Sequence, residues 1–194
     1  WEVFGNGIGN LSGSNYELDM ENSGTGSRLL MGLIAGSDVE ATILGDESLS
    51  KRPMKRIIEP LIKTGAFFDN PTNDNLPIKI RGSKIPLPIE YNSPVASAQI
   101  KSSILLAGLS STGNTTVIEP TLSRDHTERM LKSLGAIITT TKLSNSSWKI
   151  TLKGLPSLKP LDIEIPSDPS SAAFPIVASI ITPNSKVKVV NVCV

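Results

Sequence analysis

The chain of 194 residues contains one cysteine, one histidine and few aromatic side chains. One cysteine excludes an internal disulfide framework and is typical of a reducing compartment. One histidine cannot form a metal site by itself. An aromatic content of 4% argues against the base-stacking platforms of single-strand binding proteins. The chemistry of this protein must therefore rest on other side chains.

Charge and hydropathy argue against two further classes of protein, those that bind nucleic acid or acidic membranes through a general positive charge and those that span a membrane. The formal net charge is +1, so the chain has no general attraction for nucleic acid or acidic membranes, and any anion site must be local. No apolar run approaches the roughly 20 residues of a membrane span. We therefore expect a cytoplasmic protein without nucleic-acid or membrane partners. Hydrophobic residues make up 39% of the chain, enough for the core of one domain and part of another.

A repeat with a period of 73 residues organises the chain. Three segments of small hydroxyl or amide residues each open an apolar helix, and their reference positions are Gly24, Ser97 and Ser170. Ser97 follows Gly24 by 73 residues, and Ser170 follows Ser97 by the same interval. The first two helices also carry one cation each in their first two turns, Arg28 and Lys101. Such self-similarity indicates one repeated supersecondary unit.

Each of the first two helices is followed by a β-branched strand and an amphipathic helix. The strands are predicted at 41–44 and 115–118, and the helices at 54–62 and 130–134. Ser50 and Ser123 suit the N-caps of these second helices, and Gly65 and Gly135 suit their C-terminal ends. Further strands are predicted at 77–80, 87–91, 137–141, 148–152, 161–165 and 186–192.

One unit therefore reads as strand-helix-strand-helix-strand-strand. The first helix of each unit is apolar nearly all round, which is typical of a buried helix. The sheets must then lie outside a helical core. The fold class predicted from this pattern is α/β (α+β), with repeated βαβαββ units, buried helices and outer sheets. The segments 1–4 and 189–194 both resemble the interior of a strand, so we read the chain as an excerpt of a longer protein.

The helix openings predict a local anion site. Free backbone N–H groups and the positive end of the helix dipole attract phosphates and carboxylates. Helix starts that converge would make one shared site. By contrast, the Gly5-Asn6-Gly7-Ile8-Gly9 run lacks the strand, helix and acidic context of a dinucleotide site and is read as a turn.

Five ordered blocks together resemble the EPSP synthase family, the enolpyruvyl transferases of the shikimate pathway. The match looks closest to the bacterial class of glyphosate-tolerant enzymes and covers essentially the whole chain. The blocks are Asn22-Ser23-Gly24-Thr25-Gly26-Ser27-Arg28-Leu29, Lys51-Arg52-Pro53-Met54, Ser97-Ala98-Gln99-Ile100-Lys101-Ser102, Ser123-Arg124-Asp125-His126-Thr127-Glu128 and Asp168-Pro169-Ser170-Ser171-Ala172-Ala173-Phe174-Pro175.

The resemblance implies an inside-out α/β barrel of the enolpyruvyl transferase type, in which two similar domains each hold three βαβαββ units. Residues 1–166 would form most of the N-terminal domain, and residues 167–194 the first helix and strand of the C-terminal domain. Apolar surfaces left exposed by the missing parts, above all on the helix near 169–181, would favour self-association.

The resemblance also implies the reaction. The family transfers the enolpyruvyl group of phosphoenolpyruvate to the 5-hydroxyl of shikimate 3-phosphate, releasing phosphate through a tetrahedral intermediate and using no metal or organic cofactor. Glyphosate occupies the phosphoenolpyruvate position in this family. Both substrates are polyanions, so the site needs fixed cations and helix N-termini.

Site roles carry over residue by residue from the family motifs. The resemblance assigns Gly24, Arg52 and Gln99 to phosphoenolpyruvate. It assigns Ser97, Ala98, Gln99 and Arg124 to shikimate 3-phosphate, while Asn22 and Arg28 lie in the same loop and helix with less defined roles. The acid and base groups are expected outside this chain, which would hold one wall of a two-walled site and be inactive alone.

Two residues favour structural interpretations. His126 follows Arg124-Asp125 near a helix start and is expected to make local hydrogen bonds. Cys193 lies in an apolar run and is expected to pack in a core.

Two alternatives stay open at this point. One is the related enzyme that transfers enolpyruvate to UDP-N-acetylglucosamine, although no cysteine occurs between Gly45 and Arg52, where that enzyme typically carries one. The other is a non-catalytic module that retains the scaffold.

Overall fold

The computed structural model describes residues 2–72 and 74–192. The chain divides into two compact units, Trp1–Lys159 and Pro160–Val194, and each is described by itself. The predicted assignment of residues 1–166 and 167–194 to two different domains stays a prediction.

The first unit contains the βαβαββ pattern twice. The first copy runs β1 (Ser12–Asp19), α1 (Gly24–Ala35), β2 (Asp38–Leu44), α3 (Lys55–Ile62), β3 (Phe67–Phe68) and β4 (Ile78–Arg81), with the short helix α2 (Glu47–Ser50) inserted before α3. The second copy runs β5 (Glu90–Asn92), α4 (Ala98–Gly108), β6 (Asn114–Glu119), α5 (His126–Ser133), β7 (Ile138–Lys142) and β8 (Trp148–Lys153).

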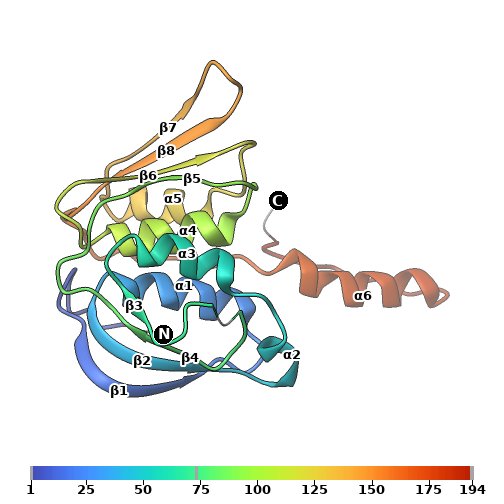
Figure 1. Ribbon diagram of the computed structural model, residues 1–194. Helices are drawn as coiled ribbons and strands as arrows, with labels where there is room; N and C mark the ends of the chain where they lie inside the picture. Colours follow the sequence, from blue (N-terminus) through green and yellow to red (C-terminus); the bar gives the residue numbers. More distant parts are fainter. Residues whose placement is uncertain (1, 73, 193–194) are drawn as a thin grey trace. The chain divides into compact units, whose positions relative to one another are not determined.

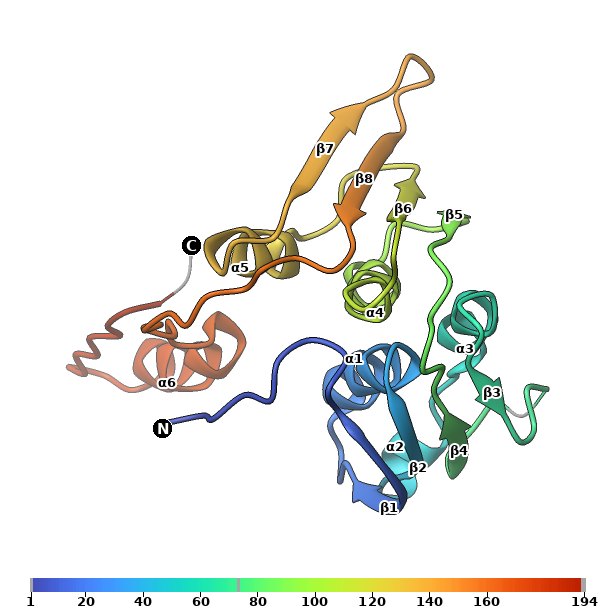
Figure 2. The ribbon, with the colours of Figure 1, turned by 90° about the vertical axis from the view of Figure 1, so that its left-hand side faces the viewer.

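The two copies also share their sheet topology. One sheet has the order β1-β2-β4-β3 and the other β5-β6-β8-β7. In each sheet the first pair of strands is parallel and the other two pairs are antiparallel. Helices α1, α3, α4 and α5 lie between the two sheets (Figure 1), and Figure 2 shows each sheet on the outer side of these helices. The predicted fold class, with inner helices and outer sheets, is confirmed.

Small residues allow α1 and α4 to cross closely. A side chain at Gly32 would meet the backbone of Ser103, and one at Gly36 would meet the backbone of Ala107. Gly32 lies in α1 and Gly36 is its C-cap, and because the two glycines are four residues apart they lie on the same side. The two glycine–backbone contacts place the two repeat helices against each other in the middle of the unit.

Burial follows the sequence pattern of each element. In β4, Ile78 and Ile80 are buried while Lys79 and Arg81 are exposed, as the alternation of a sheet with one wet face requires. The apolar side of α3 is buried through Ile57, Ile58 and Leu61. One large cluster of buried residues spans α1, α3, α4 and the first sheet, and a second lies under β7 and β8.

Helix capping matches the sequence at some positions and differs at others. Ser97 caps α4 by accepting a hydrogen bond from the backbone N–H of Ile100. Ser50 was predicted as an N-cap, but it is the last residue of α2, and α3 begins only at Lys55. Pro53 follows within this stretch and disfavours a helical residue before it.

The predicted N-cap at Ser123 is also wrong, because α5 begins at His126 with Asp125 in the cap position. Ser123 instead donates its side-chain hydroxyl to Glu119. Gly135 follows the C-cap of α5 with φ of +104°, a conformation that favours glycine and supports its predicted place at the helix end.

Three predicted strands are shorter than expected or not formed. The 87–91 segment contributes only to β5 (Glu90–Asn92). The 161–165 segment is not a strand, and within 186–192 the only pairing is an isolated bridge from Val192 to Ser167. β-branched composition alone does not form a strand without a neighbouring edge to pair with.

The second unit is organised around α6 (Pro169–Ile181). Asp168 caps this helix, accepting hydrogen bonds from the backbone N–H groups of Ser170 and Ser171. The helix is apolar and exposes Phe174, Ile180 and other large side chains, which is the exposed apolar surface expected on this helix from the sequence. Cys193 and its predicted core position lie outside the described residues. No helix in 2–72 and 74–192 has the length and apolar character to cross a membrane.

Candidate functional site

The first turns of α1 and α4 are joined by the side chain of Gln99. Its Oε1 accepts a hydrogen bond from Arg28 Nη1 at 2.9 Å, and its Nε2 donates to Thr25 Oγ1 at 2.8 Å. The N-terminal ends of the two repeat helices are therefore adjacent. Free N–H groups and dipoles from both ends favour an anion at this place.

Arg52 joins the same region from the loop after α2. Its Nη2 donates to Asn22 Oδ1 at 2.6 Å and to Ser48 Oγ at 3.3 Å. Asn22 in turn donates to Asp46 Oδ2 at 2.7 Å. This last hydrogen bond is the largest of several contacts that lower the pKa of the Asp46 carboxyl. The chain from Asp46 through Asn22 orients the guanidinium of Arg52.

Gly24 lies against two guanidinium groups. A Cβ atom built at Gly24 would be 3.0 Å from Arg52 Nη1, 3.4 Å from Arg28 Nη1 and 3.5 Å from Leu49 Cδ1. Gly24 is buried and is the first residue of α1. The missing side chain keeps the space between the two cations and the helix end free.

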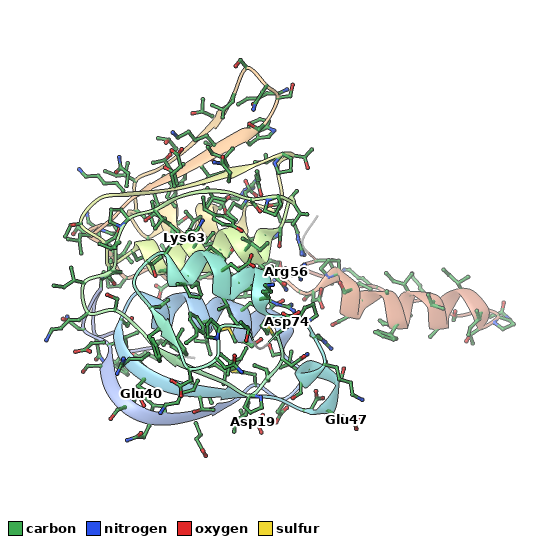
Figure 3. All side chains as sticks on the ribbon, in the orientation of Figure 1. Asp19, Glu40, Glu47, Arg56, Lys63 and Asp74 are labelled. Atoms are coloured by element: carbon green, nitrogen blue, oxygen red, sulfur yellow. The ribbon has the colours of Figure 1, made fainter. Side chains whose placement is uncertain are left out.

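Arg28 is a buried cation with incomplete hydrogen bonding. Besides Gln99 it donates to the backbone oxygen of Pro53 at 3.1 Å, while its Nε has no hydrogen-bond partner among the described residues. Burial, and then the positive charges of Arg56 and Arg52, lower the pKa of Arg28. Figure 3 shows Arg56 in the first turn of α3, on the same side as the loop with Asp74. Positive charge therefore gathers around the start of α1.

A surface pocket of about 420 Å³ lies beside the start of α4. It is lined by Ala96, Ser97, Ala98, Gln99, Ser123 and Arg124. Arg124 is exposed, and its side chain makes no hydrogen bond or ion pair with any described residue. A free guanidinium beside a helix N-terminus suits a phosphate group.

The structure brings the sequence-predicted site residues into two adjacent groups. Asn22, Gly24, Arg28 and Arg52 surround the start of α1, and Ser97, Ala98 and Arg124 line the pocket at the start of α4. Gln99 belongs to both groups. These are the two substrate groupings expected from the sequence, although their roles stay predictions.

Two residues that orient this region were not predicted. Thr25 fixes the amide of Gln99, and Asp46 fixes Asn22. The 73-residue period could have pointed to Asp46, because another carboxylate, Glu119, occurs 73 residues later at the end of the equivalent strand. No cluster of three or more His, Cys, Asp or Glu side chains suited to a metal occurs among the described residues.

Comparisons with known proteins identify the relatives of this chain. The family model for EPSP synthase (3-phosphoshikimate 1-carboxyvinyltransferase) matches residues 2–194. The chain is 52% identical over 192 residues to a 3-phosphoshikimate 1-carboxyvinyltransferase of Parvibaculum lavamentivorans, and 50% identical over 192 residues to one of Rhodospirillum rubrum. Each of these alignments covers 99% of this chain and 43% of the relative.

Solved structures agree with the sequence relatives. An EPSP synthase from Acinetobacter baumannii matches with a TM-score of 0.73 and 46% identity, covering 86% of this chain and 37% of that one. The chain thus spans less than half the length of the relatives that it matches.

Proposed function

We propose that this chain, which belongs to the EPSP synthase family, supplies one wall of a site for enolpyruvyl transfer from phosphoenolpyruvate to shikimate 3-phosphate. The observation that carries the proposal is the pair of anion-binding groups joined by Gln99. One group holds two guanidinium ions at the start of α1, and the other holds Arg124 at the start of α4. Two polyanionic substrates that must meet need such a pair.

The proposed reaction joins the two anions at their reacting ends. The 5-hydroxyl oxygen of shikimate 3-phosphate loses its proton and forms a bond to C2 of phosphoenolpyruvate while C3 gains a proton, which gives the tetrahedral intermediate. The C2–O bond to phosphate then breaks, C3 loses a proton so that the C2–C3 double bond is restored, and inorganic phosphate leaves. The residues of this chain bind and orient, because Arg52 and Arg124 offer charge-assisted hydrogen bonds to substrate oxygens. We place the acid and base groups outside these 194 residues, and we place the enzyme in the cytoplasm.

Phosphate release by the complete gene product tests this proposal. With both substrates present we expect turnover, and with either one omitted we expect none. Arg124→Ala should raise the KM for shikimate 3-phosphate about tenfold or more, the loss typical of one charge-assisted hydrogen bond. Arg81→Ala is the matched control, since Arg81 lies exposed on β4 and takes no part in the site. Absence of turnover in the wild-type protein would refute the proposal.

The 194-residue chain should be inactive in the same assay. Stabilisation of the transition state requires groups on both sides of the reacting atoms at hydrogen-bond distance. Turnover of about 1 per second or more, an ordinary enzymatic rate, would contradict the view of this chain as one wall of the site.

We also propose that the isolated chain self-associates. Helix α6 exposes five large apolar side chains, and apolar patches of this kind promote association. They are Phe174, Ile176, Val177, Ile180 and Ile181. Light scattering at tens of micromolar should show a dimer or larger species, and a clean monomer would contradict this proposal.

A further inference from the structure

Lys101 is a fully buried cation next to the candidate site, and the proposed function leaves it without a role. It lies in α4, four residues after Ser97, and its exposed fraction is 0%. Its Nζ lies 3.1 Å from Glu119 Oε1 and 2.7 Å from Glu128 Oε1. The three residues, here called the buried triad, come from α4, β6 and α5.

The buried triad holds Ser123 at every polar atom. Glu119 accepts hydrogen bonds from the backbone N–H of Ser123 at 2.8 Å and from its side-chain hydroxyl at 2.7 Å. Lys101 donates to the backbone oxygen of Ser123 at 3.4 Å. Glu128 forms an ion pair with Lys101, and neither of its carboxylate oxygens has a hydrogen-bond partner among the described residues.

This anchoring fixes one side of the pocket. Ser123 and Arg124 line the pocket together with Ser97, Ala98 and Gln99 of the α4 start. The Arg124 side chain has no partner among the described residues. The backbone at Ser123 therefore determines the position from which the Arg124 side chain extends. Lys101 lies on the same helix as Gln99, so the triad ties the two sides of the pocket together.

Core stability does not explain the buried triad. A buried ion pair is weak evidence for stability, because apolar residues of similar volume commonly fill such a place equally well. Apolar residues could not, however, bind the amide and hydroxyl of Ser123. The charged groups of the buried triad therefore serve to hold the loop at Ser123 rather than to stabilise the core.

The first repeat is built in the same way. Arg28, the counterpart of Lys101 by the 73-residue period, donates to the backbone oxygen of Pro53. Asp46, the counterpart of Glu119, accepts from the backbone N–H of Leu49 at 2.7 Å. In each repeat a cation of the first helix and a carboxylate at or just after the end of the second strand bind the segment that leads to the second helix. That segment carries Arg52 in the first repeat and Arg124 in the second.

We infer that Lys101, Glu119 and Glu128 are positioning residues, which set the place of Arg124 for binding the phosphate of shikimate 3-phosphate. This inference rests on the proposed function. It makes the buried triad a determinant of affinity for one substrate, although none of its members lines the pocket.

The test compares Glu119→Ala with Glu119→Gln in the complete gene product. Alanine removes both acceptors of Ser123. Glutamine keeps one acceptor for the backbone N–H and offers a donor to the hydroxyl oxygen, in nearly the same volume. Ser102→Ala is the control, since it removes a 2.7 Å hydrogen bond between α4 and Thr127 of α5 without touching Ser123.

We expect Glu119→Ala to raise the KM for shikimate 3-phosphate about tenfold, with kcat and the KM for phosphoenolpyruvate changing less than about threefold. Glu119→Gln should recover most of the lost affinity, and Ser102→Ala should resemble the wild type. Equal effects of alanine and glutamine, or equal changes in both KM values, would overturn the inference and indicate a merely structural role.

Hydrogen exchange at the Ser123 amide separates this inference from the proposed function. The amide should be protected in the wild type, exposed in Glu119→Ala and protected again in Glu119→Gln. A wild-type protein without transfer activity refutes the proposed function, and the inference with it. An active wild type whose Ser123 amide and KM values do not respond to Glu119→Ala refutes the inference alone.

Discussion

Gly24→Ala tests whether the space between the two guanidinium groups belongs to the phosphoenolpyruvate position. The new methyl carbon would lie 3.0 Å from Arg52 Nη1, which is closer than ordinary van der Waals contact, and 3.4 Å from Arg28 Nη1, which is at the limit of such contact. Arg52 must give way by a few tenths of an ångström. Its hydrogen bonds to Asn22 and Ser48 resist that movement.

We expect Gly24→Ala to weaken the binding of glyphosate, the longer ligand, more than that of phosphoenolpyruvate. Overpacking by one methyl typically costs about 1–3 kcal/mol, which is roughly 5- to 150-fold in a binding constant. Glyphosate is longer than phosphoenolpyruvate, so it should meet the methyl at Gly24 directly. Phosphoenolpyruvate should lose less affinity, because it experiences only the small displacement of Arg52.

The assay measures the glyphosate inhibition constant and the KM for phosphoenolpyruvate in the complete gene product. We expect the first constant to rise several-fold more than the second. Gly5→Ala is the control, since a Cβ there meets no atom within 4 Å. If both constants rise by the same factor, or if glyphosate inhibition is unchanged, the steric argument at Gly24 is wrong.

Three further predictions concern the stability of the 194-residue chain. Lys101→Met leaves two buried carboxylates without their cation, so urea titration should show a loss of about 3–5 kcal/mol in the free energy of unfolding; a loss below about 1 kcal/mol would contradict this. In Gly32→Ala the new Cβ would collide with the backbone of Ser103, and we expect a loss of about 1–3 kcal/mol, whereas Gly5→Ala should stay within about 0.5 kcal/mol of the wild type. Because the pKa of Asp46 is lowered in the folded state, the ionised carboxylate stabilises the fold at pH values above the ordinary aspartate pKa. This stabilisation is lost as the pH falls through the folded-state pKa. Asp46→Asn should therefore show a weaker fall in urea midpoint between about pH 5 and pH 2 than the wild type, and an unchanged slope would refute the assignment.

The period of 73 residues was enough to predict most of the fold. It gave the strand-helix-strand-helix-strand-strand order of the unit, and the apolar helices indicated that the sheets lie outside. In the first repeat it did not locate β1, α2 or β3. The period did not predict where the second helices begin. At Ser50 and Ser123 the pattern favoured a cap, because serine suits that position locally. In the structure Ser50 ends α2, shortly before Pro53, and Ser123 lies in the loop before α5. Glu119 holds the backbone N–H and the hydroxyl of Ser123 there, a contact that the local pattern around Ser123 does not show.

The candidate site was predictable only in part, for the same reason. The resemblance named the residues predicted to bind the two substrates, and the structure places these residues in two adjacent groups. It did not name Thr25, Asp46 or the buried triad. These residues act through hydrogen bonds between elements far apart in the sequence, such as the 2.8 Å contact from Gln99 to Thr25. A charged residue in an apolar helix, as at Lys101, was the visible signal for one of them.

The close crossing of α1 and α4 makes the width of the site sensitive to a distant position. Gly32 lies eight residues after Gly24, which is about 12 Å along a helix at 1.5 Å per residue. A rotation of about 5° around the crossing would thus move the first turn of α1 by about 1 Å, enough to cost a positioned reaction about a hundredfold. Substitutions that alter only the packing of α1 against α4 can therefore change the affinity for both substrates together. Comparisons of sequences that consider only the predicted ligand-binding residues will overlook such substitutions.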